Sequence, residues 1–188
     1  MYRIIRATAA HDAAITVISD AVFGLGFMPD LPTLRTTHMG FVACLDGEVA
    51  GFVFGELHDE ASFQQRLHNP GPVPTERLYG VIDPLAVAPA HQGRGVGGRL
   101  LEAVTAALQE LGASFLAAPA WGYRREGCVH VNAAPLLWAN GFNLRTVASC
   151  YWQVPCERGE FTCLHKTNPC TCSLNVYCKD LRSTDRCR

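Results

Sequence analysis

The sequence predicts one α/β domain in which a strongly twisted, mixed β-sheet is flanked by helices. A strand, a helix and a second strand follow one another closely near the middle of the chain, and such short connections indicate a βαβ unit with parallel strands. Earlier in the chain, an Asp-Gly pair separates two strand-like runs, which is typical of an antiparallel hairpin. The length of 188 residues suits one ordinary domain, residues 1–188.

The N-terminal residues predict a strand followed by a helix. Residues 2–6 alternate in polarity like a strand. Thr8 offers an N-cap for a helix over residues 9–22, with Asp12 in its first turn. Residues 24–37 have no clear period and predict a loop, with a short helix inside it as an alternative.

The next segment predicts the hairpin and a long connection. Residues 40–45 and 49–57 flank Asp46-Gly47, which favours a type I′ turn between antiparallel strands. Residues 59–76 are polar and contain three prolines, which predicts a surface loop or partial disorder.

The second half of the chain supplies the parallel unit and the remaining strands. Residues 78–87 form a largely apolar strand, and residues 114–118 form another. Between them, apolar residues recur at helical spacing from Val96 to Leu111, and Gly112 is the expected end of that helix. Further on, the sequence predicts a short helix at 132–140, closed by Gly141, and strands at 144–154 and 173–181.

Composition argues against a highly charged partner. The 16 basic and 17 acidic residues are interspersed, and the formal net charge is −1. The sequence lacks the cluster of basic residues that is typical of proteins that bind nucleic acids or membrane surfaces. We therefore expect a small-molecule or peptide substrate. The apolar stretch 13–28 is interrupted by Asp20 and suits neither a signal peptide nor a membrane span. We therefore expect a soluble, cytoplasmic protein, and a homodimer remains an open alternative.

A glycine-rich loop at residues 92–98 lies between a predicted strand and a predicted helix. The free N–H groups at a helix start attract a diphosphate, provided that no Cβ atoms block the approach. Glycines at 93, 95, 97 and 98 remove that obstruction, although glycine also serves tight turns and close packing. A Rossmann loop would follow the first strand of the chain, and a Walker loop would contain a lysine, so neither pattern fits.

This region resembles the central motif of the GNAT N-acetyltransferases. Residues 85–89, Leu-Ala-Val-Ala-Pro, are followed by the family pattern at Gln92, Gly95 and Gly97, and then by Leu100-Leu101. Asn132 and the Gly141-Phe142 pair are similar to the second motif of the family. The resemblance extends over most of the chain and is strongest at the central motif.

The resemblance implies a GNAT-like sheet with splayed central parallel strands and acetyl-CoA as cofactor. In that family the pantetheine arm inserts between the splayed strands, and amides of the glycine-rich loop hold the pyrophosphate. The cofactor-binding residues implied for this chain are Leu85, Ala86, Val87, Gln92, Gly93, Arg94, Gly95, Val96, Gly97, Gly98 and Asn132. A core role for residues 85–87 and an N-cap role for Asn132 are the structural alternatives.

Acetyl transfer requires a neutral amine, which at a lysine-like pKa near 10.4 needs a base or desolvation. Asp83 is the single carboxylate on the predicted central strand, and we predict that it is catalytic, as a base through water or as an anchor for the amine. A cap or turn role beside Pro84 is the alternative. Glu56 and His91 are weaker candidates, for which an exposed, solvated position is expected.

The sequence departs from the GNAT pattern at the general acid. The family places a tyrosine four residues before the Gly-Phe pair, where this chain has Leu137. Because a thiol with a pKa near 8.5 can leave as thiolate, a dedicated acid is not essential. Tyr123 and Tyr151 are substitutes or, alternatively, packing residues.

The C-terminal region is rich in cysteine. Seven of the nine cysteines lie in the last 39 residues, and a Cys-rich loop at 155–172 is predicted between the last two strands. Zinc ligands, reduced structural thiols and a regulatory disulfide are the three alternatives. The predicted zinc ligands are Cys156, Cys163, Cys170 and Cys172, with His165 as a replacement for one of them.

Together these features predict an acetyl-CoA-dependent N-acetyltransferase. It would move an acetyl group directly to a primary amine of a small molecule or peptide, without a covalent enzyme intermediate. A non-catalytic acyl-CoA-binding protein, or a thiol or metal sensor on the same fold, is the competing hypothesis. The sequence carries no pattern that identifies the acceptor amine.

Overall fold

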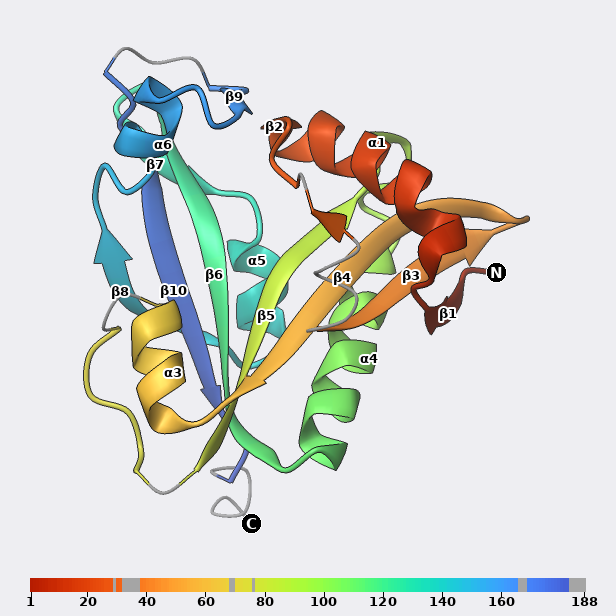
Figure 1. The fold of residues 1–188 in the computed structure, drawn as a ribbon, viewed down its shortest axis with the longest axis horizontal. Coiled ribbons are helices and arrows are strands. Elements are labelled where there is room, and N and C mark those ends of the chain that lie inside the picture. Colours follow the sequence, from red (N-terminus) through yellow and green to blue (C-terminus); the bar gives the residue numbers. More distant parts are fainter. Residues whose placement is uncertain (29, 32–37, 68–69, 76, 166–168, 183–188) are drawn as a thin grey trace.

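The computed structural model describes the chain except for residues 29, 32–37, 68–69, 76, 166–168 and 183–188 (Figure 1). The strands are β1 (Arg3–Arg6), β2 (Gly24–Leu25), β3 (Met39–Leu45), β4 (Glu48–His58), β5 (Leu78–Val87), β6 (Ala113–Arg125), β7 (Cys128–Val131), β8 (Asn143–Ala148), β9 (Thr162–Cys163) and β10 (Ser173–Asp180). The helices are α1 (Asp12–Val22), α3 (Glu60–Arg66), α4 (Val96–Glu110), α5 (Ala134–Ala139) and α6 (Gln153–Glu157), with 3-10 turns at Ala9–His11 and Pro89–His91.

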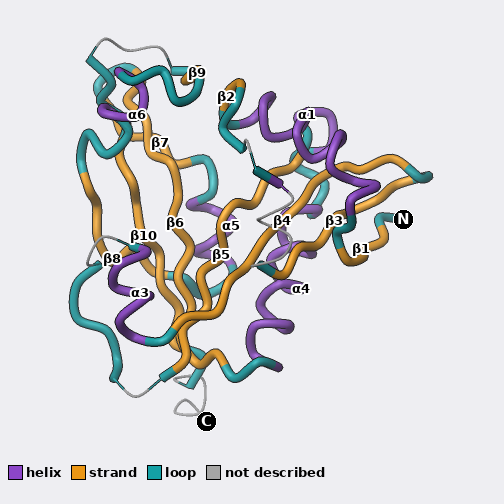
Figure 2. Tube along the Cα trace, in the orientation of Figure 1, coloured by secondary structure: helices purple, strands orange, loops and turns teal. Residues whose placement is uncertain are grey.

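The main sheet has eight strands and is mixed, as predicted. Its order is β1-β3-β4-β5-β6-β10-β8, and β7 pairs with β6 (Figure 2). The β5–β6 pair is parallel, whereas every other pair of this sheet within the described residues is antiparallel. The strands β2 and β9 form a separate, two-stranded antiparallel ladder.

Helices cover both faces of the sheet (Figure 1). Helices α4 and α5 bury Leu100, Val104 and Leu137 against one face. The opposite face is covered in two parts, because Ile15 and Ile18 of α1 and Phe63 of α3 belong to separate apolar clusters. Strand residues alternate between these faces, since successive side chains of a strand point to opposite sides.

Local signals account for the elements that the sequence predicted well. At the first helix, the Thr8 N–H donates to His11 Nδ1 over 3.0 Å, and the predicted helix begins as a 3-10 turn before α1. In the β3–β4 hairpin, Asp46 and Gly47 have φ angles of 49° and 90°, as a type I′ turn requires. At the end of α4, Gly112 has a φ of 94°, which confirms the predicted stop.

The expectation of a loop over residues 59–76 was wrong for its first part. Helix α3 begins after Asp59, whose side chain accepts a hydrogen bond from the Ser62 N–H at 2.8 Å. Phe63 and Leu67, four residues apart, are almost fully buried. The N-cap and this apolar pair stabilise a short helix, and the prolines that suggested a loop lie beyond its end.

Other boundaries also differ from the predictions. The predicted strand 144–154 ends at Ala148, because Cys150 adopts a φ of 55° and α6 follows. The predicted strand 114–118 continues to Arg125 and turns into β7, which the sequence did not predict. The loop 24–37 contains β2, but its residues 29 and 32–37 lie outside the described part of the chain.

The central parallel strands diverge, as the resemblance implied. Their pairing begins at Leu78↔Ala113 and ends at Val81↔Ala117, although both strands continue well beyond that point. Figure 1 shows β5 and β6 close together at one end and far apart at the other. The second half of β5 therefore faces an opening in the sheet.

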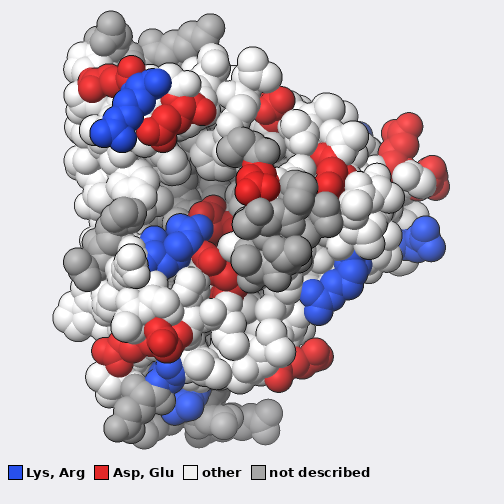
Figure 3. Space-filling view, viewed as in Figure 1, with Lys and Arg blue, Asp and Glu red and all other residues white. Residues whose placement is uncertain are grey.

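Charges of both signs are scattered over the face seen in Figure 3, with no extended patch of one sign. Among the described residues, no helix is both long and apolar enough to cross a membrane.

Candidate active site

A cavity of about 700 Å³ lies where β5 and β6 diverge. It extends from the end of β5 over the start of α4 and reaches the region of β6 and α5. Of the predicted cofactor-binding residues, all but Arg94 line it: Leu85, Ala86, Val87, Gln92, Gly93, Gly95, Val96, Gly97, Gly98 and Asn132. One cavity thus brings together residues from two distant parts of the sequence.

The glycine-rich loop leaves its backbone open toward this cavity. Gly93 and Gly95 have φ angles of 71° and 78°, which favour glycine over other residues. A Cβ atom at either position would meet no atom within 4 Å, so the space beside these two glycines is open in the described part of the chain. Gly95 is the N-cap of the 15-residue α4, where unpaired amides and the helix dipole favour an anion. The side chain of Gln92 stabilises the loop, because its Nε2 donates to the Val87 carbonyl at 3.0 Å.

The edge of β5 provides the second feature of the cavity. Residues 85–87 pair with β4 through Val53↔Leu85, Phe52↔Ala86 and Gly51↔Val87. On the other side of β5, no described strand pairs with residues 82–87, since the ladder with β6 ends at Val81. Peptide groups on this side can pair with an extended ligand in the way a further strand would.

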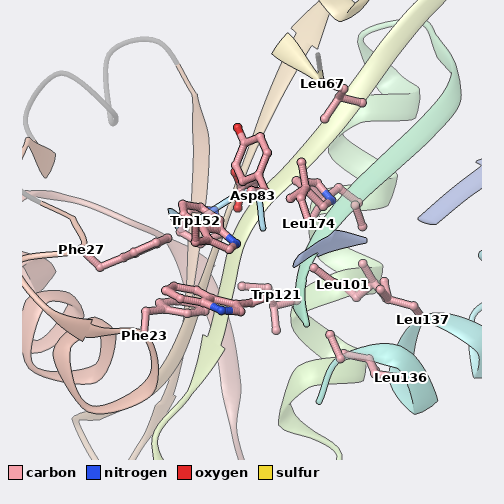
Figure 4. Close-up of a pocket in the computed structure, with 18 of the residues that line it drawn as sticks. Phe23, Phe27, Leu67, Asp83, Leu101, Trp121, Leu136, Leu137, Trp152 and Leu174 are labelled. Carbon is pink, nitrogen blue, oxygen red and sulfur yellow. The ribbon is translucent and has the colours of Figure 1, made fainter. Parts of the chain in front are cut away.

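A smaller pocket of about 120 Å³ adjoins this cavity and shares Phe23, Leu85, Trp121 and Leu136 with it. Its lining is mainly apolar and aromatic. Figure 4 shows Phe23, Phe27, Trp121 and Trp152 on one side of this pocket and Leu101, Leu136 and Leu137 on the other, with Asp83 between them. Trp121 and Trp152 stack with their ring centroids 4.6 Å apart.

Asp83 lies on the wall of the smaller pocket and is held by an arginine. Its Oδ2 accepts a hydrogen bond from Arg66 Nη2 at 2.7 Å, and 28% of its side chain remains exposed. Burial raises the pKa of Asp83 above its usual range, while the charge of Arg66 acts in the opposite direction. A carboxylate with a raised pKa is a better base than an ordinary aspartate.

Glu56 shares the same arginine, and the expectation that it would be exposed was wrong. Arg66 Nε contacts Glu56 Oε1 at 2.5 Å, and His38 and His58 contact Glu56 Oε2 at 2.9 and 3.3 Å. Only 12% of the Glu56 side chain is exposed. Burial alone would raise the pKa of Glu56, but the hydrogen bond from His38 and the charge of Arg66 hold it at about 2.

We expect this arrangement to make stability depend on pH. Because the pKa of Glu56 is about 2 in the folded chain and its ordinary value is 4.5, its contribution is present above pH 4.5 and is lost as the pH falls toward 2. Glu56→Gln should lower the free energy of unfolding by roughly 3 kcal/mol at pH 7 and by much less at pH 3. Urea unfolding of both proteins across this range measures the effect, and a constant difference would contradict it.

The other predicted polar candidates occupy different places. His91 is half-buried and lines the large cavity, and its Nδ1 lies 2.9 Å from the Tyr2 hydroxyl. The Tyr123 hydroxyl donates to Asn132 Oδ1 at 3.1 Å, and Asn132 is not an N-cap, since Ala133 holds that position of α5.

The position of the usual family tyrosine holds no acid. Leu137 is 3% exposed and lines the smaller pocket. Tyr151 lines the same pocket as Asp83, and burial raises its pKa. Of the two substitute tyrosines, Tyr151 is therefore the one nearer to Asp83.

The predicted zinc ligands come close together. The Sγ atoms of Cys156, Cys163 and Cys170 all lie within 4.8 Å of one another. Cys172 is outside this set, but its thiol interacts with those of Cys170 and Cys163. His165 does not belong to the set either, because its ring stacks on that of Tyr123 with centroids 3.8 Å apart.

Several residues of the site were not found from the sequence. Arg66 lay in a segment that was expected to be a loop, although Asp59 and the spacing of Phe63 and Leu67 were available as signals for a helix. The aromatic wall had no local signal, because Phe23, Phe27, Trp121 and Trp152 come from three separate regions of the sequence.

Comparisons with known proteins agree with this geometry. Residues 18–123 match the model of the acetyltransferase (GNAT) family. No curated protein is significantly similar to the chain in sequence.

Solved structures share the fold at low identity. An IAA acetyltransferase from Bacillus cereus aligns with a TM-score of 0.64 and 17% identity, covering 96% of this chain and 100% of that one. A GNAT family acetyltransferase from Elizabethkingia anophelis with acetyl-CoA bound gives a TM-score of 0.60 and 17% identity, with 96% and 98% covered. Arabidopsis thaliana NAA60, in complex with a bisubstrate analogue, aligns with a TM-score of 0.68 and 11% sequence identity. The alignment covers 96% of this chain and 98% of that one.

The family match includes the diverging strands and the glycine-rich start of α4, which are the features that form the cavity. The chain belongs to the GNAT family of acetyltransferases.

Proposed function

We propose that this chain transfers the acetyl group of acetyl-CoA to a primary amine of a small molecule or peptide, and that residues 1–188 act as one domain. The observation that supports this most directly is the connection between the two pockets. A cavity suited to a pyrophosphate and an extended arm adjoins a pocket that contains a carboxylate, and Leu85 lines both. Donor and acceptor can therefore meet beside the middle of β5.

For the donor, each part of acetyl-CoA has a matching part of the cavity. Amides from Gly93 to Gly98 would hold the pyrophosphate at the start of α4, while Gln92 and Arg94 complete the loop around it. The pantetheine arm would pair with the free edge of residues 85–87, and Asn132 lies on the opposite wall. When bound, acetyl-CoA supplies the activated acetyl group.

The chemical step is a direct substitution at the thioester carbon. The neutral amine nitrogen attacks this carbon, the C–N bond forms and the C–S bond breaks, and the CoA sulfur leaves with the electron pair. Asp83 would take the proton of the ammonium group through water, or would hold the amine in place. A free strand N–H of β5 would donate to the oxygen as negative charge develops on it.

Tyr151 is the residue that we propose as the source of the proton for the leaving group. Tyr151 lines the smaller pocket together with Asp83, whereas Tyr123 lines only the large cavity. We assign the general acid to Tyr151 on this ground. Because a thiolate can leave without protonation, its contribution to the rate should be modest.

The acceptor pocket favours a particular kind of amine. Arg66 is shared by Glu56 and Asp83, so the three groups together have a net charge of −1 when ionised. The remaining wall is apolar and aromatic. Such a pocket suits a cationic amine with a compact apolar or aromatic body, and it disfavours an acceptor that carries a carboxylate next to its amine.

A panel of amines tests both the activity and this preference. Release of CoA thiol from acetyl-CoA should be fastest with amines such as phenethylamine and at least about tenfold slower with phenylalanine, which adds a carboxylate to the same body. Binding of acetyl-CoA without turnover on any amine, peptide or polyamine would instead support the non-catalytic alternative. Faster turnover of phenylalanine would contradict the proposed acceptor class.

We also propose a zinc ion as a second, structural cofactor. It would be held by the C-terminal cysteines and would not touch the reacting atoms.

A further inference from the structure

Two of the clustered cysteines, Cys156 and Cys163, lie in a segment that has little apolar burial of its own. This segment, residues 153–165, contains α6 and β9 and will be called the α6–β9 segment. Helix α6 has only five residues, none of which is buried, and β9 has only two residues. Helices this short are not stable from backbone propensity alone, so other interactions must hold the segment in place.

The cluster itself provides a candidate for that interaction. Cys156 comes from α6 and Cys163 from β9, whereas Cys170 and Cys172 precede β10 and are 5% and 1% exposed. In a tetrahedral zinc site with Zn–S bonds near 2.3 Å, the sulfur atoms lie about 3.8 Å apart. The Sγ atoms of Cys156, Cys163 and Cys170 lie within 4.8 Å of one another, so each would need to move by only about 1 Å to reach the spacing of a zinc site.

A disulfide explains the cluster less well. Eight cysteines of the chain are described, and all eight are free thiols. One disulfide would join two of the four clustered cysteines and would leave the other two unpaired in a half-buried or buried position. A single zinc ion would use all four, because thiolate sulfur is a preferred ligand for zinc.

The α6–β9 segment pairs with a distant part of the chain. Its strand β9 pairs with β2 through Gly24↔Cys163 and Leu25↔Thr162. The contact is close, since a Cβ atom on Gly24 would lie 2.0 Å from the Thr162 carbonyl oxygen. In Figure 1, β2 and β9 face each other beyond the diverging ends of β5 and β6.

The segment and the residue directly before it contribute to both pockets. Trp152, the N-cap of α6, forms part of the smaller pocket and stacks on Trp121. Phe161 contacts Phe27 and Trp121, with ring centroids 5.7 and 5.4 Å apart. His165 lines the large cavity. The aromatic wall of the acceptor pocket therefore depends on the position of the α6–β9 segment.

We infer that Cys156, Cys163, Cys170 and Cys172 bind one zinc ion, and that this ion fixes the α6–β9 segment as the wall of the acceptor pocket. Binding releases to solvent the proton of each thiol that becomes a ligand. The role of the ion is structural, and its effect on acceptor binding rests on the acetyl transfer proposed above.

The first test is metal analysis of protein purified under reducing conditions without chelator. About one zinc per chain is expected, as for a four-cysteine structural site. Cys156→Ser and Cys172→Ser should lose the zinc, while Cys128→Ser, an exposed cysteine outside the cluster, should retain it. Cobalt(II) in place of zinc should give the absorption of a tetrahedral thiolate complex. A metal-free protein with freely titrating thiols, a disulfide within the cluster, or full zinc content in both variants would overturn the site.

The second test removes the metal from the wild-type protein. Chelation should lower the melting temperature and increase proteolytic cleavage within residues 153–165. If the segment is then ordered in only about a tenth of the molecules, the KM for the acceptor should rise about tenfold, while the Kd for acetyl-CoA changes far less. An unchanged acceptor KM after complete metal removal would overturn the role of the ion. A zinc-loaded protein that does not bind acetyl-CoA would contradict the proposed transferase activity and would leave the metal site standing.

Discussion

Replacing Gly95 or Gly97 by leucine is expected to weaken acetyl-CoA binding by at least about 100-fold while the protein stays folded. A Cβ atom at Gly95 would meet no atom within 4 Å, whereas one at Gly97 would lie 3.2 Å from Leu136, which lines the cavity. A leucine at Gly95 would project into the open space above the loop, and one at Gly97 would push against Leu136 and narrow the cavity, so both should exclude the pyrophosphate. The loss of two charge-assisted hydrogen bonds, at about 1.5–3 kcal/mol each, corresponds to this factor or more. Calorimetric titration with acetyl-CoA measures it.

Each variant has a matched control. The control for Gly95→Leu is Gly47→Leu, because Gly95 and Gly47 both have positive φ angles, 78° and 90°. A Cβ atom added at either position would meet no atom within 4 Å. Gly47 lies in the β3–β4 turn and not in the glycine-rich loop. Gly47→Leu should therefore suffer the same backbone strain, about 1–2 kcal/mol, and still bind acetyl-CoA. Ala106→Leu adds a leucine to an exposed position of α4 and serves as control for Gly97→Leu. Unchanged affinity in both glycine variants would remove the loop from the cofactor site.

The glycine-rich loop and the strands around it could be predicted because their signals are local. A helix period from Val96 onward, a glycine at position 112 and an Asp-Gly turn each reflect the conformation of a few neighbouring residues. The divergence of β5 and β6 has no such signal. It was expected from the family resemblance and is confirmed by a ladder that ends at Val81↔Ala117.

The smaller pocket, which we propose for the acceptor, could not be predicted, because tertiary contacts create it. Trp121 and Trp152 are 31 positions apart in the sequence, yet their rings stack in the folded chain. The pairing of Glu56 and Asp83 with one arginine depends on α3, which the sequence predicted as loop. A carboxylate that looks solvated in the sequence can thus belong to a half-buried ion network, and its position depends on elements far away in the chain.

The shared arginine also bears on which carboxylate acts in the reaction. Both Glu56 and Asp83 contact Arg66, but only Asp83 lines the smaller pocket. Their pKa values are shifted in opposite directions, since that of Glu56 is held at about 2 and that of Asp83 is raised. A base must accept a proton during the reaction, and the group with the raised pKa does so more readily.

Asp83→Asn is therefore expected to lower kcat by about 100-fold to 10,000-fold, with the Kd for acetyl-CoA little changed. The asparagine keeps the size of the side chain but can neither accept the proton nor attract the ammonium group. The loss should be greatest at low pH, where most of the acceptor is protonated and depends on a base.

Glu56→Gln is the matched control, because it removes the other carboxylate partner of Arg66. It should lower stability at neutral pH and reduce kcat far less than Asp83→Asn. The reverse order of the two kcat values would assign the base to Glu56, and a fully active Asp83→Asn enzyme would exclude Asp83 from the mechanism.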